Sequence, residues 1–348
     1  MISPICWLKS LFLQSMDHKA ILTQLKKKEY APVYFLQGDE PYFIDLIVNY
    51  IEKNVLNEGE RSFNQVVLYG KETDFKQVLD QARQFPMMSP YRVVIIKEAQ
   101  SMKGLENLAP YFEKPSEQTI LVVAHKYKFI DKRKKKLWSA IKENAVILES
   151  KKLYDNKIPA YIVNLAKAKK LTVDNKTAFV IAEHLGNDLS KVSNEIDKLA
   201  LNLEAGTTVS NDHVQQYIGI SKDYNVFEFQ KALGQKNKTK AYRIIKYYAQ
   251  NKKAHPIQMN VGSIYGYFLK LFIAKKYERS DDRTMASKLK VNPFFVGEYK
   301  QAVRNYTMPQ IKNAFKYIHE MDKKSKGVGS RYANDLGIYQ EFLFKLFA

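Results

Sequence analysis

Residues 33–44 are the first place where the sequence could do chemistry. An apolar strand, a glycine turn and a helix near Pro41 follow one another there, as in nucleotide-binding folds that hold a phosphate loop in the turn. A P-loop requires Gly-x-x-x-x-Gly-Lys-Ser/Thr, but Gly38 is followed by no second glycine, no lysine and no Ser or Thr for Mg²⁺. Asp39 and Glu40 would also repel a triphosphate. We predict a degenerate nucleotide site without a cofactor.

Acidic and metal-binding patterns are equally sparse. Lys97-Glu98-Ala99 stands where a nucleotide-binding fold places a carboxylate pair for Mg²⁺, and it supplies one acid. The sequence contains no His-Glu-x-x-His, no Gly-x-Ser-x-Gly and no Cys/His metal spacing. We interpret Asp281-Asp282 as part of a charged, solvated linker rather than a two-metal site. Nothing in the sequence argues for an enzyme or for a bound metal.

Residues 83–97 contain a site suited to binding rather than catalysis. Pro86 and Pro90 bracket Met87 and Met88, and each proline restricts the residue before it to extended geometry. Adjacent side chains cannot both point inward from a regular helix or strand, so at least one methionine is expected to face solvent or a partner. The pattern alone favours the alternative that both methionines fill the core.

The elements that position these residues alternate between strand and helix. Apolar runs predict buried strands at residues 33–36, 93–96, 119–124 and 146–148 and a further strand at 64–68, with helical periodicity between them. This alternation predicts an α/β fold with a parallel sheet over residues 16–150. The basic run at residues 131–136 precedes Leu137, Trp138 and Ile141, so we interpret it as the solvated face of a helix rather than a nucleic-acid site.

Helical periodicity continues through residues 151–348, which predicts two all-helical domains at 151–220 and 221–348. The second has 25 basic and 10 acidic residues, which is +15 of the chain's net +20. This charge suits a phosphate backbone or an acidic partner, and a solubilising surface explains it equally well. A basic loop predicted at 323–330 offers Lys323, Lys324 and Lys326 as candidate contacts to DNA or other subunits. The apolar excess of the helix predicted at 257–277 is expected to pack against other subunits.

The N-terminal segment and the cysteine content bear on location. Cys6 is the only cysteine, which excludes an intramolecular disulfide and fits a reducing cytosol. Residues 1–15 have no basic leader or cleavage site and are too short to span a bilayer. We interpret Met16 as the natural start and residues 1–15 as a non-native or disordered extension, with a membrane anchor as the alternative. The protein is expected to be cytoplasmic and to bind no membrane.

Several motifs occur in a characteristic order. They are the strand, turn and helix of residues 33–44; Pro86-Met87-Met88 before Arg92-Val93-Val94; Asp131-Lys132-Arg133-Lys134-Lys135; His184-Leu185-Gly186-Asn187-Asp188-Leu189 leading to Asn194-Glu195-Ile196-Asp197-Lys198-Leu199; and the weaker Asn225-Val226-Phe227-Glu228, Ala232-Leu233, Asp322 and Lys326-Gly327. From Met16 to the C-terminus, this order resembles the delta subunit of the bacterial DNA polymerase III clamp loader.

The resemblance implies a non-catalytic, AAA+-like subunit for DNA replication in the bacterial cytoplasm, associated with the nucleoid. It implies that residues 16–150 bind the sliding clamp (beta) and open one ring interface, that residues 151–220 form a small helical lid, and that residues 221–348 join a collar. The partners it implies are the ATPase subunits (gamma/tau), delta prime and primer-template DNA. The family inserts two adjacent apolar residues into a pocket of the clamp, and Met87 and Met88, between Pro86 and Pro90, occupy those positions.

Two other function classes remain open at this point. A free-standing nucleic-acid-binding protein would use the basic C-terminal domain and would bind DNA tightly in a salt-sensitive way. An ATPase with an unorthodox site would hydrolyse ATP as a pure protein, and a change in the loop at Gly38 would abolish that activity.

Overall fold

The computed structural model describes residues 16–221, 223–329 and 334–348. The chain divides into two compact units, Met1–Leu153 and Tyr154–Ala348. The division of the second unit at residue 220 stays a prediction, and the interpretation of residues 1–15 lies outside the described residues.

The first unit is built on a five-stranded sheet in the order β2-β3-β4-β1-β5, with every neighbouring pair parallel. The strands are β1 (Val33–Gly38), β2 (Gln65–Tyr69), β3 (Arg92–Lys97), β4 (Thr119–Lys126) and β5 (Val146–Ser150). The three central strands are buried almost throughout, as their continuous apolar runs predict. The predicted parallel α/β sheet is confirmed.

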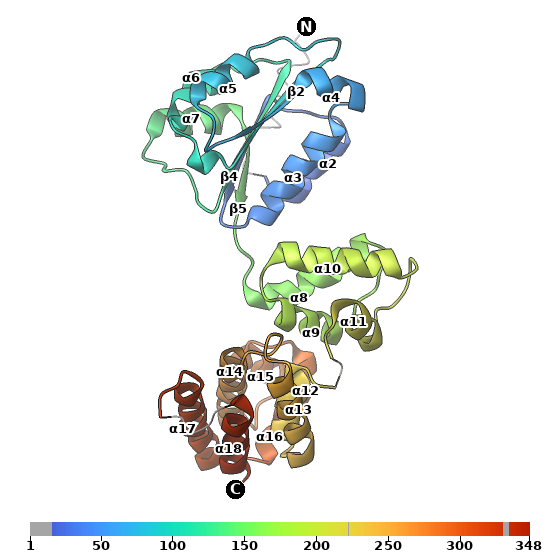
Figure 1. Ribbon diagram of the computed structural model, residues 1–348, viewed down its shortest axis with the longest axis vertical. Coiled ribbons are helices and arrows are strands. Elements are labelled where there is room, and N and C mark those ends of the chain that lie inside the picture. The colour runs from blue at the N-terminus through green and yellow to red at the C-terminus, as the bar shows by residue number, and fades with distance from the viewer. Residues whose placement is uncertain (1–15, 222, 330–333) are drawn as a thin grey trace. The chain divides into compact units, whose positions relative to one another are not determined.

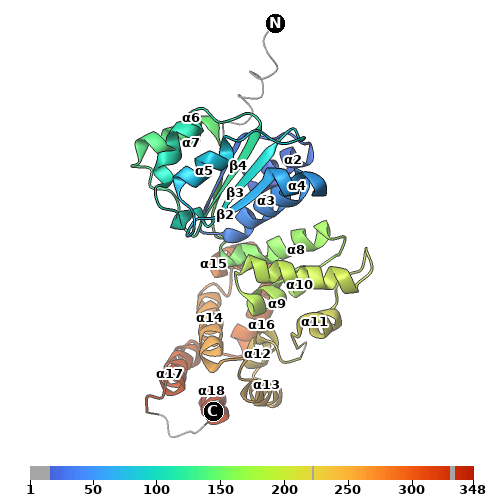
Figure 2. The same cartoon turned by 45° about the horizontal axis from the view of Figure 1, so that its top comes forward.

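Helices cover both faces of this sheet (Figure 1, Figure 2). One face carries α2 (His18–Lys26), α3 (Pro41–Asn54) and α4 (Glu58–Asn64), and the other carries α5 (Phe75–Ala82), α6 (Ala109–Glu113), α7 (Lys135–Asn144) and the short 3₁₀ turns η1 (Ala99–Ser101) and η2 (Leu105–Leu108). On the second face Phe35 and Val123 of the sheet share a core with Phe112 and Ile141. In α7, Leu137 and Ile141 are buried while residues 131–136 are exposed, and residues 131–134 precede the helix. The interpretation of this basic run as merely solvated stays a prediction.

The second unit is helical. Its first part contains η3 (Asp155–Lys157), α8 (Ile158–Ala168), α9 (Asn175–Leu185), α10 (Leu189–Asn202) and α11 (Asn211–Ile218). Its second part contains α12 (Val226–Gly234), α13 (Lys238–Gln250), α14 (Ile257–Lys276), α15 (Asp282–Leu289), η4 (Pro293–Phe295), α16 (Val296–Arg304), α17 (Met308–Ser325) and α18 (Asp335–Phe347). Asp188 caps α10, because its Oδ1 accepts hydrogen bonds from the amides of Ser190 and Lys191 at 3.1 Å.

Three expectations for the second unit need correction. Asp281 and Asp282 begin α15 rather than lying in a linker: the Asp281 carboxylate caps the Thr284 amide at 2.9 Å. The apolar excess of α14 is mostly internal, because α14 packs against α12, α15, α16 and α17 in one core. The basic loop predicted from Lys323 starts later, since α17 continues to Ser325.

Candidate docking surface

The loop between α5 and β3 exposes large apolar side chains. Met88 is fully exposed at 103% of its reference area, and Met87 is 60% exposed. Phe85 in the same loop is 81% exposed, and Phe63 near the end of α4 is 63% exposed. The core-filling alternative for the two methionines is therefore wrong. We call Phe63, Phe85, Met87 and Met88 the apolar patch, and exposed apolar side chains grouped in this way are typical of a binding surface.

The backbone of Met88 explains its exposure. Its φ of 52° lies in the left-handed region, which a side-chain-bearing residue adopts at a cost of roughly 1 kcal/mol or more. Pro86 and Pro90 stand on either side, so the backbone between them has few alternative conformations. The loop thus holds Met88 outward in a conformation that other contacts must stabilise.

Asn64 makes those contacts from the last position of α4. Its side chain is fully buried; its Oδ1 accepts a hydrogen bond from the Met87 amide at 2.7 Å, and its Nδ2 donates to the Met87 carbonyl at 2.9 Å. The same Nδ2 donates to the Glu60 carbonyl at 3.2 Å. One amide therefore closes the end of α4 and binds both polar groups of the Met87 backbone.

Arg92, the first residue of β3, forms hydrogen bonds to the ends of α4 and α5 next to this loop. Its buried guanidinium donates to the Phe63 carbonyl at 3.1 Å and to the Gln81 carbonyl and side-chain oxygen at 2.9 and 2.5 Å. Burial lowers the pKa of the Arg92 guanidinium below its usual value. The ends of α4 and α5 are thus joined beside the loop.

The sequence suggested the two methionines and the two prolines, but it missed Phe63 and Asn64 as parts of this surface. The short helix that carries them was not predicted, because it is polar and Asn64 is its only buried residue. No local signal links Asn64 to Met87, which lies 23 residues away.

The turn after β1 is packed where a phosphate loop would be. β1 ends at Gly38 and α3 begins at Pro41, so Asp39 and Glu40 alone connect them. The Glu40 amide donates to the Ser150 carbonyl at 3.3 Å, and the Ser150 hydroxyl donates to the Glu40 carbonyl at 2.6 Å. The Glu40 carboxylate accepts from the Tyr42 amide at 3.2 Å, which caps the helix end that would otherwise face an anion.

The three lysines proposed as DNA or subunit contacts differ in their surroundings. Lys324 is bound in an ion-pair network, with its Nζ 2.6 Å from both carboxylate oxygens of Glu341. Lys326 pairs with Asp322 at 2.8 Å. Within the described ranges Lys323 has no ion pair within 4.0 Å, and it is exposed.

Lys323 belongs to a longer array along α17. Lys312, Lys316, His319 and Lys323 are all exposed and follow one another at intervals of 4, 3 and 4 residues, so they share one face of the helix. The acidic residues on the same helix have other partners, since Glu320 pairs with Lys345 at 2.6 Å and Asp322 with Lys326. We call these four exposed residues the basic stripe.

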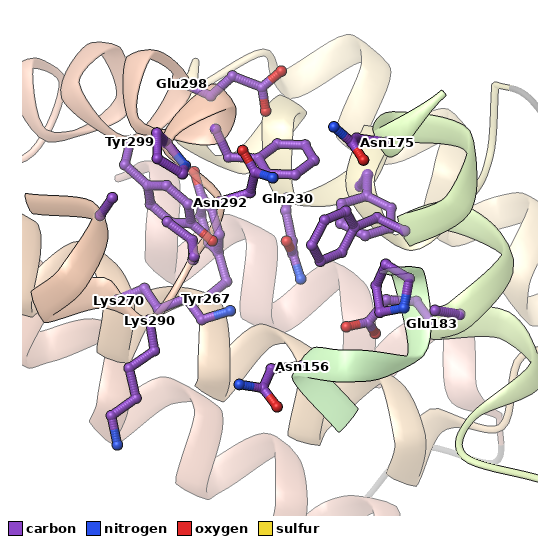
Figure 3. A pocket seen from close by; sticks show the side chains of 18 of the residues that line it. Asn156, Asn175, Glu183, Gln230, Tyr267, Lys270, Lys290, Asn292, Glu298 and Tyr299 are labelled. Atoms are coloured by element: carbon purple, nitrogen blue, oxygen red, sulfur yellow. The ribbon is translucent and has the colours of Figure 1, made fainter. Parts of the chain in front are cut away.

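A cavity of about 1110 Å³ lies within the second unit, between α8 and α9 on one side and α12, α14, α15 and α16 on the other (Figure 3). Its lining mixes acidic, basic, amide and aromatic side chains, including Glu183, Lys270, Lys290 and Tyr299. Desolvation raises the pKa of Glu183, and Lys270 partly opposes that shift. No single charge or donor set dominates, so the lining does not identify a ligand.

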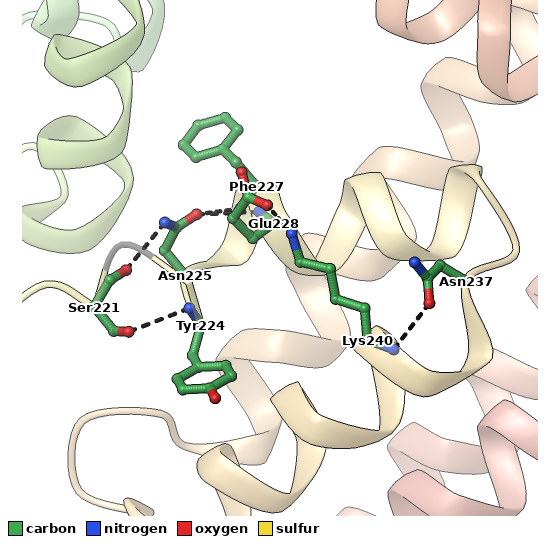
Figure 4. Close-up of polar contacts among 7 residues, drawn as sticks. All are labelled: Ser221, Tyr224, Asn225, Phe227, Glu228, Asn237 and Lys240. Atoms are coloured by element: carbon green, nitrogen blue, oxygen red, sulfur yellow. Dashed lines mark hydrogen bonds and ion pairs between the residues drawn. The ribbon is translucent and has the colours of Figure 1, made fainter.

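The Asn225-Val226-Phe227-Glu228 motif has a structural role at the start of α12 (Figure 4). The Asn225 Oδ1 accepts from the amides of Phe227 and Glu228 at 3.0 and 3.1 Å, and its Nδ2 donates to the Ser221 carbonyl at 3.0 Å. Glu228 then forms an ion pair with Lys240 of α13. The motif therefore fixes the entry to the last group of helices.

Across residues 16–221, 223–329 and 334–348, no group of three or more His, Cys, Asp or Glu residues is arranged to hold a metal ion. No helix in those ranges is long and apolar enough to cross a membrane.

The parallel sheet with helices on both faces, followed by helical bundles, defines an AAA+-like protein. Residues 34–151 match the family DNA polymerase III, delta subunit, and residues 223–340 match the DNA polymerase III delta subunit, C-terminal domain. The chain belongs to the DNA polymerase III delta subunit family.

Individual relatives agree with this assignment. The DNA polymerase III subunit delta of Bacillus subtilis (strain 168) is 27% identical over 315 residues, which cover 87% of this chain and 90% of the relative. The solved structure of the Bacillus subtilis DNA clamp loader delta protein (YqeN) has a TM-score of 0.55 and 25% identity, covering 95% of this chain and 99% of that chain.

Proposed function

We propose that this clamp-loader subunit binds the sliding clamp through Met87 and Met88 and opens one interface of the ring. The observation that carries the proposal is the full exposure of Met88 beside the exposed Met87, on a loop whose backbone is held by a buried residue. Two flexible thioether side chains suit an apolar pocket on a partner. The exposed side chains of Phe85 and Phe63 would extend the area that contacts the clamp.

Burial of the patch supplies the binding energy. Transferring two methionine side chains from water to a pocket is worth roughly 3–6 kcal/mol before the costs of association. Because Met88 is exposed throughout and Met87 is partly covered, Met88 contributes the larger share. This energy opens a ring only if the open ring fits the patch better than the closed ring, since a ligand shifts an equilibrium by its differential affinity.

The subunit would perform no chemistry of its own. This part of the proposal is supported by the two-residue connection between β1 and α3, by its hydrogen bonds to Ser150 and by the capping carboxylate of Glu40, which offer a triphosphate no glycine-rich cradle. We propose that ATP acts in neighbouring gamma/tau subunits, and that residues 221–348 join those subunits and delta prime in a collar. The division into residues 16–150, 151–220 and 221–348 is part of this proposal.

A binding assay with the clamp from the same organism tests the central claim. The wild-type chain is expected to retain the clamp, and the Met87→Ala/Met88→Ala variant is expected to lose most of that binding while keeping its melting temperature. A pair of fluorophores across one clamp interface reports opening. Unchanged binding by the folded double variant would refute the assignment, and binding without any change in the fluorophore distance would refute ring opening alone.

A second function is supported by the basic stripe on α17. Lys312, Lys316 and Lys323 lie on one exposed face without an ion pair among the described residues, which suits a row of backbone phosphates. We propose that this stripe contacts primer-template DNA within the complex. Lys324 is removed from the proposed DNA contacts because Glu341 and its network already neutralise it, while Lys326, paired with Asp322, is a weaker candidate.

A further inference from the structure

The backbone of the Met87–Met88 segment has little support from its own loop. Residues 84–91 contain no helix or strand, and the Met87 amide and carbonyl both hydrogen-bond to the side chain of Asn64. Ser89 adds a bond from its hydroxyl to the Tyr91 carbonyl at 3.3 Å. The position of Met87 therefore depends on a side chain from another element.

The Asn64 amide is well suited to this contact. It matches one donor and one acceptor of Met87 with the opposite groups, so a rotated amide would place donor against donor. Because the Asn64 side chain is fully buried, leaving its own amide group unpaired would be costly, which favours keeping both bonds to Met87. The two bonds define one backbone position for Met87 and, through it, the left-handed turn at Met88.

We propose that Asn64 is the positioning residue of the clamp-binding surface, holding Met87 and Met88 in the docking conformation before the clamp arrives. This inference rests on the proposed clamp binding. Asn64 does not itself contact the clamp, since its side chain is buried. Its effect on affinity arises because a partner that meets an ordered loop does not bear the entropy cost of ordering it.

The same amide couples the patch across two elements. Asn64 directly follows Phe63, whose carbonyl is held by Arg92 at 3.1 Å. The contact to Met87 therefore joins the α4 end of the patch to the loop end. Without the Asn64 side chain, the end of α4 at Phe63 and the loop at Met87 are expected to move independently of each other. Arg92 would still hold the end of α4, and the loop would still lead into β3.

The test compares Asn64→Ala with a matched helix-end asparagine. Asn54 is the last residue of α3, and its side chain donates to the Tyr50 carbonyl at 2.8 Å, as that of Asn64 donates to the Glu60 carbonyl. Within the described residues, Asn54 makes no hydrogen bond to Met87. Asn54→Ala thus removes a helix-end hydrogen bond alone. Clamp affinity of the full chain, melting temperature and hydrogen exchange of the Met87 amide are measured for each variant.

Asn64→Ala is expected to weaken clamp binding about tenfold and to accelerate exchange at the Met87 amide. Asn54→Ala is expected to change neither. In a Met88→Ala background the effect of Asn64→Ala on affinity is expected to shrink, because Asn64 acts through the methionines. Should Asn64→Ala fail to fold, Asn64→Ser serves instead, since a hydroxyl is too short to pair with both groups of Met87.

The outcomes distinguish the positioning role of Asn64 from the proposed clamp binding on which it rests. If wild type binds the clamp and the methionine variants do not, clamp binding stands. If Asn64→Ala then accelerates exchange at Met87 without weakening binding, the positioning role is wrong. The positioning role is also wrong if Asn64→Ala weakens clamp binding by the same factor in the wild-type background and in the Met88→Ala background. The effect of Asn64 on affinity would then not depend on the Met88 side chain. A wild-type chain that does not bind the clamp overturns the proposed function itself.

Discussion

Gly38 and Ser150 meet backbone to backbone: a Cβ placed on Gly38 would lie 1.9 Å from the Ser150 carbonyl oxygen. Gly38 also has a φ of +137°, which residues with side chains rarely adopt. The turn that would otherwise be a phosphate loop is thereby closed onto the end of β5. The close approach makes the conformation of this turn part of the packing of the sheet.

Gly38→Ala is therefore expected to destabilise the first unit by about 3 kcal/mol or more, because it combines a backbone clash with strain. Gly262→Ala is the matched control. Gly262 lies inside α14 with nothing within 4 Å of its added Cβ, so the substitution should stabilise by roughly 0.5–1 kcal/mol. Urea unfolding measures both. A Gly38→Ala variant as stable as wild type would show that the turn can open.

Met88 allows contact and strain to be separated. Met88→Ala and Met88→Gly both remove the exposed side chain, so each is expected to weaken clamp binding by roughly 5–30-fold. Their stabilities should differ, because glycine adopts the left-handed conformation at φ 52° without strain. We expect Met88→Gly to exceed Met88→Ala by about 1 kcal/mol in unfolding free energy. Equal affinity of Met88→Ala and wild type would remove Met88 from the interface.

The sequence predicts the sheet well because the signals are local. Four consecutive β-favouring residues, Val93 to Ile96, belong to a strand buried on both faces, and apolar runs also mark the buried strands β1 and β4. The edge strand β2 is only partly buried. Asp188 likewise marks the start of α10 through a side chain that caps amides two and three residues ahead. Signals of this kind need no knowledge of the tertiary fold.

The missed features depend on distant contacts. α15 begins at an acidic pair that also suits a loop, and its helical nature shows only in the burial of Met285 and Leu289 against other helices. The contact between Asn64 and Met87 joins positions that are close only after β2 and β3 pair. For the same reason the sequence could suggest Met87 and Met88 as a contact but could not say what fixes their conformation.

Glu341 is expected to make the second unit sensitive to acid. Hydrogen bonds from Lys324 and Lys345 lower the pKa of Glu341 from 4.5 to about 2. Because the folded pKa lies below the unfolded one, the stabilisation is complete above about pH 4.5 and is lost as the pH falls to about 2. Glu341→Gln is expected to cost about 1 kcal/mol at pH 7. The difference from wild type should vanish near pH 2.

Denaturation at a series of pH values measures this profile. Glu204→Gln is the control, since Glu204 is exposed and has no ion pair within the described ranges. Its stability is expected to follow wild type at each pH. A Glu341→Gln variant with the acid sensitivity of wild type would assign that sensitivity to other carboxylates.

The basic stripe predicts how DNA binding depends on salt. If Lys312, Lys316 and Lys323 each contact a phosphate, changing all three to alanine should reduce the slope of log affinity against log salt by about 3, with little dependence on DNA sequence. Lys135, Lys136 and Lys142, which are exposed on α7, provide a control with the same loss of charge outside the basic stripe. Fluorescence anisotropy with primer-template DNA measures both triple variants. Equal slopes for the two would show a general charge effect, whereas tight binding by the isolated wild-type chain would favour a free-standing nucleic-acid-binding protein.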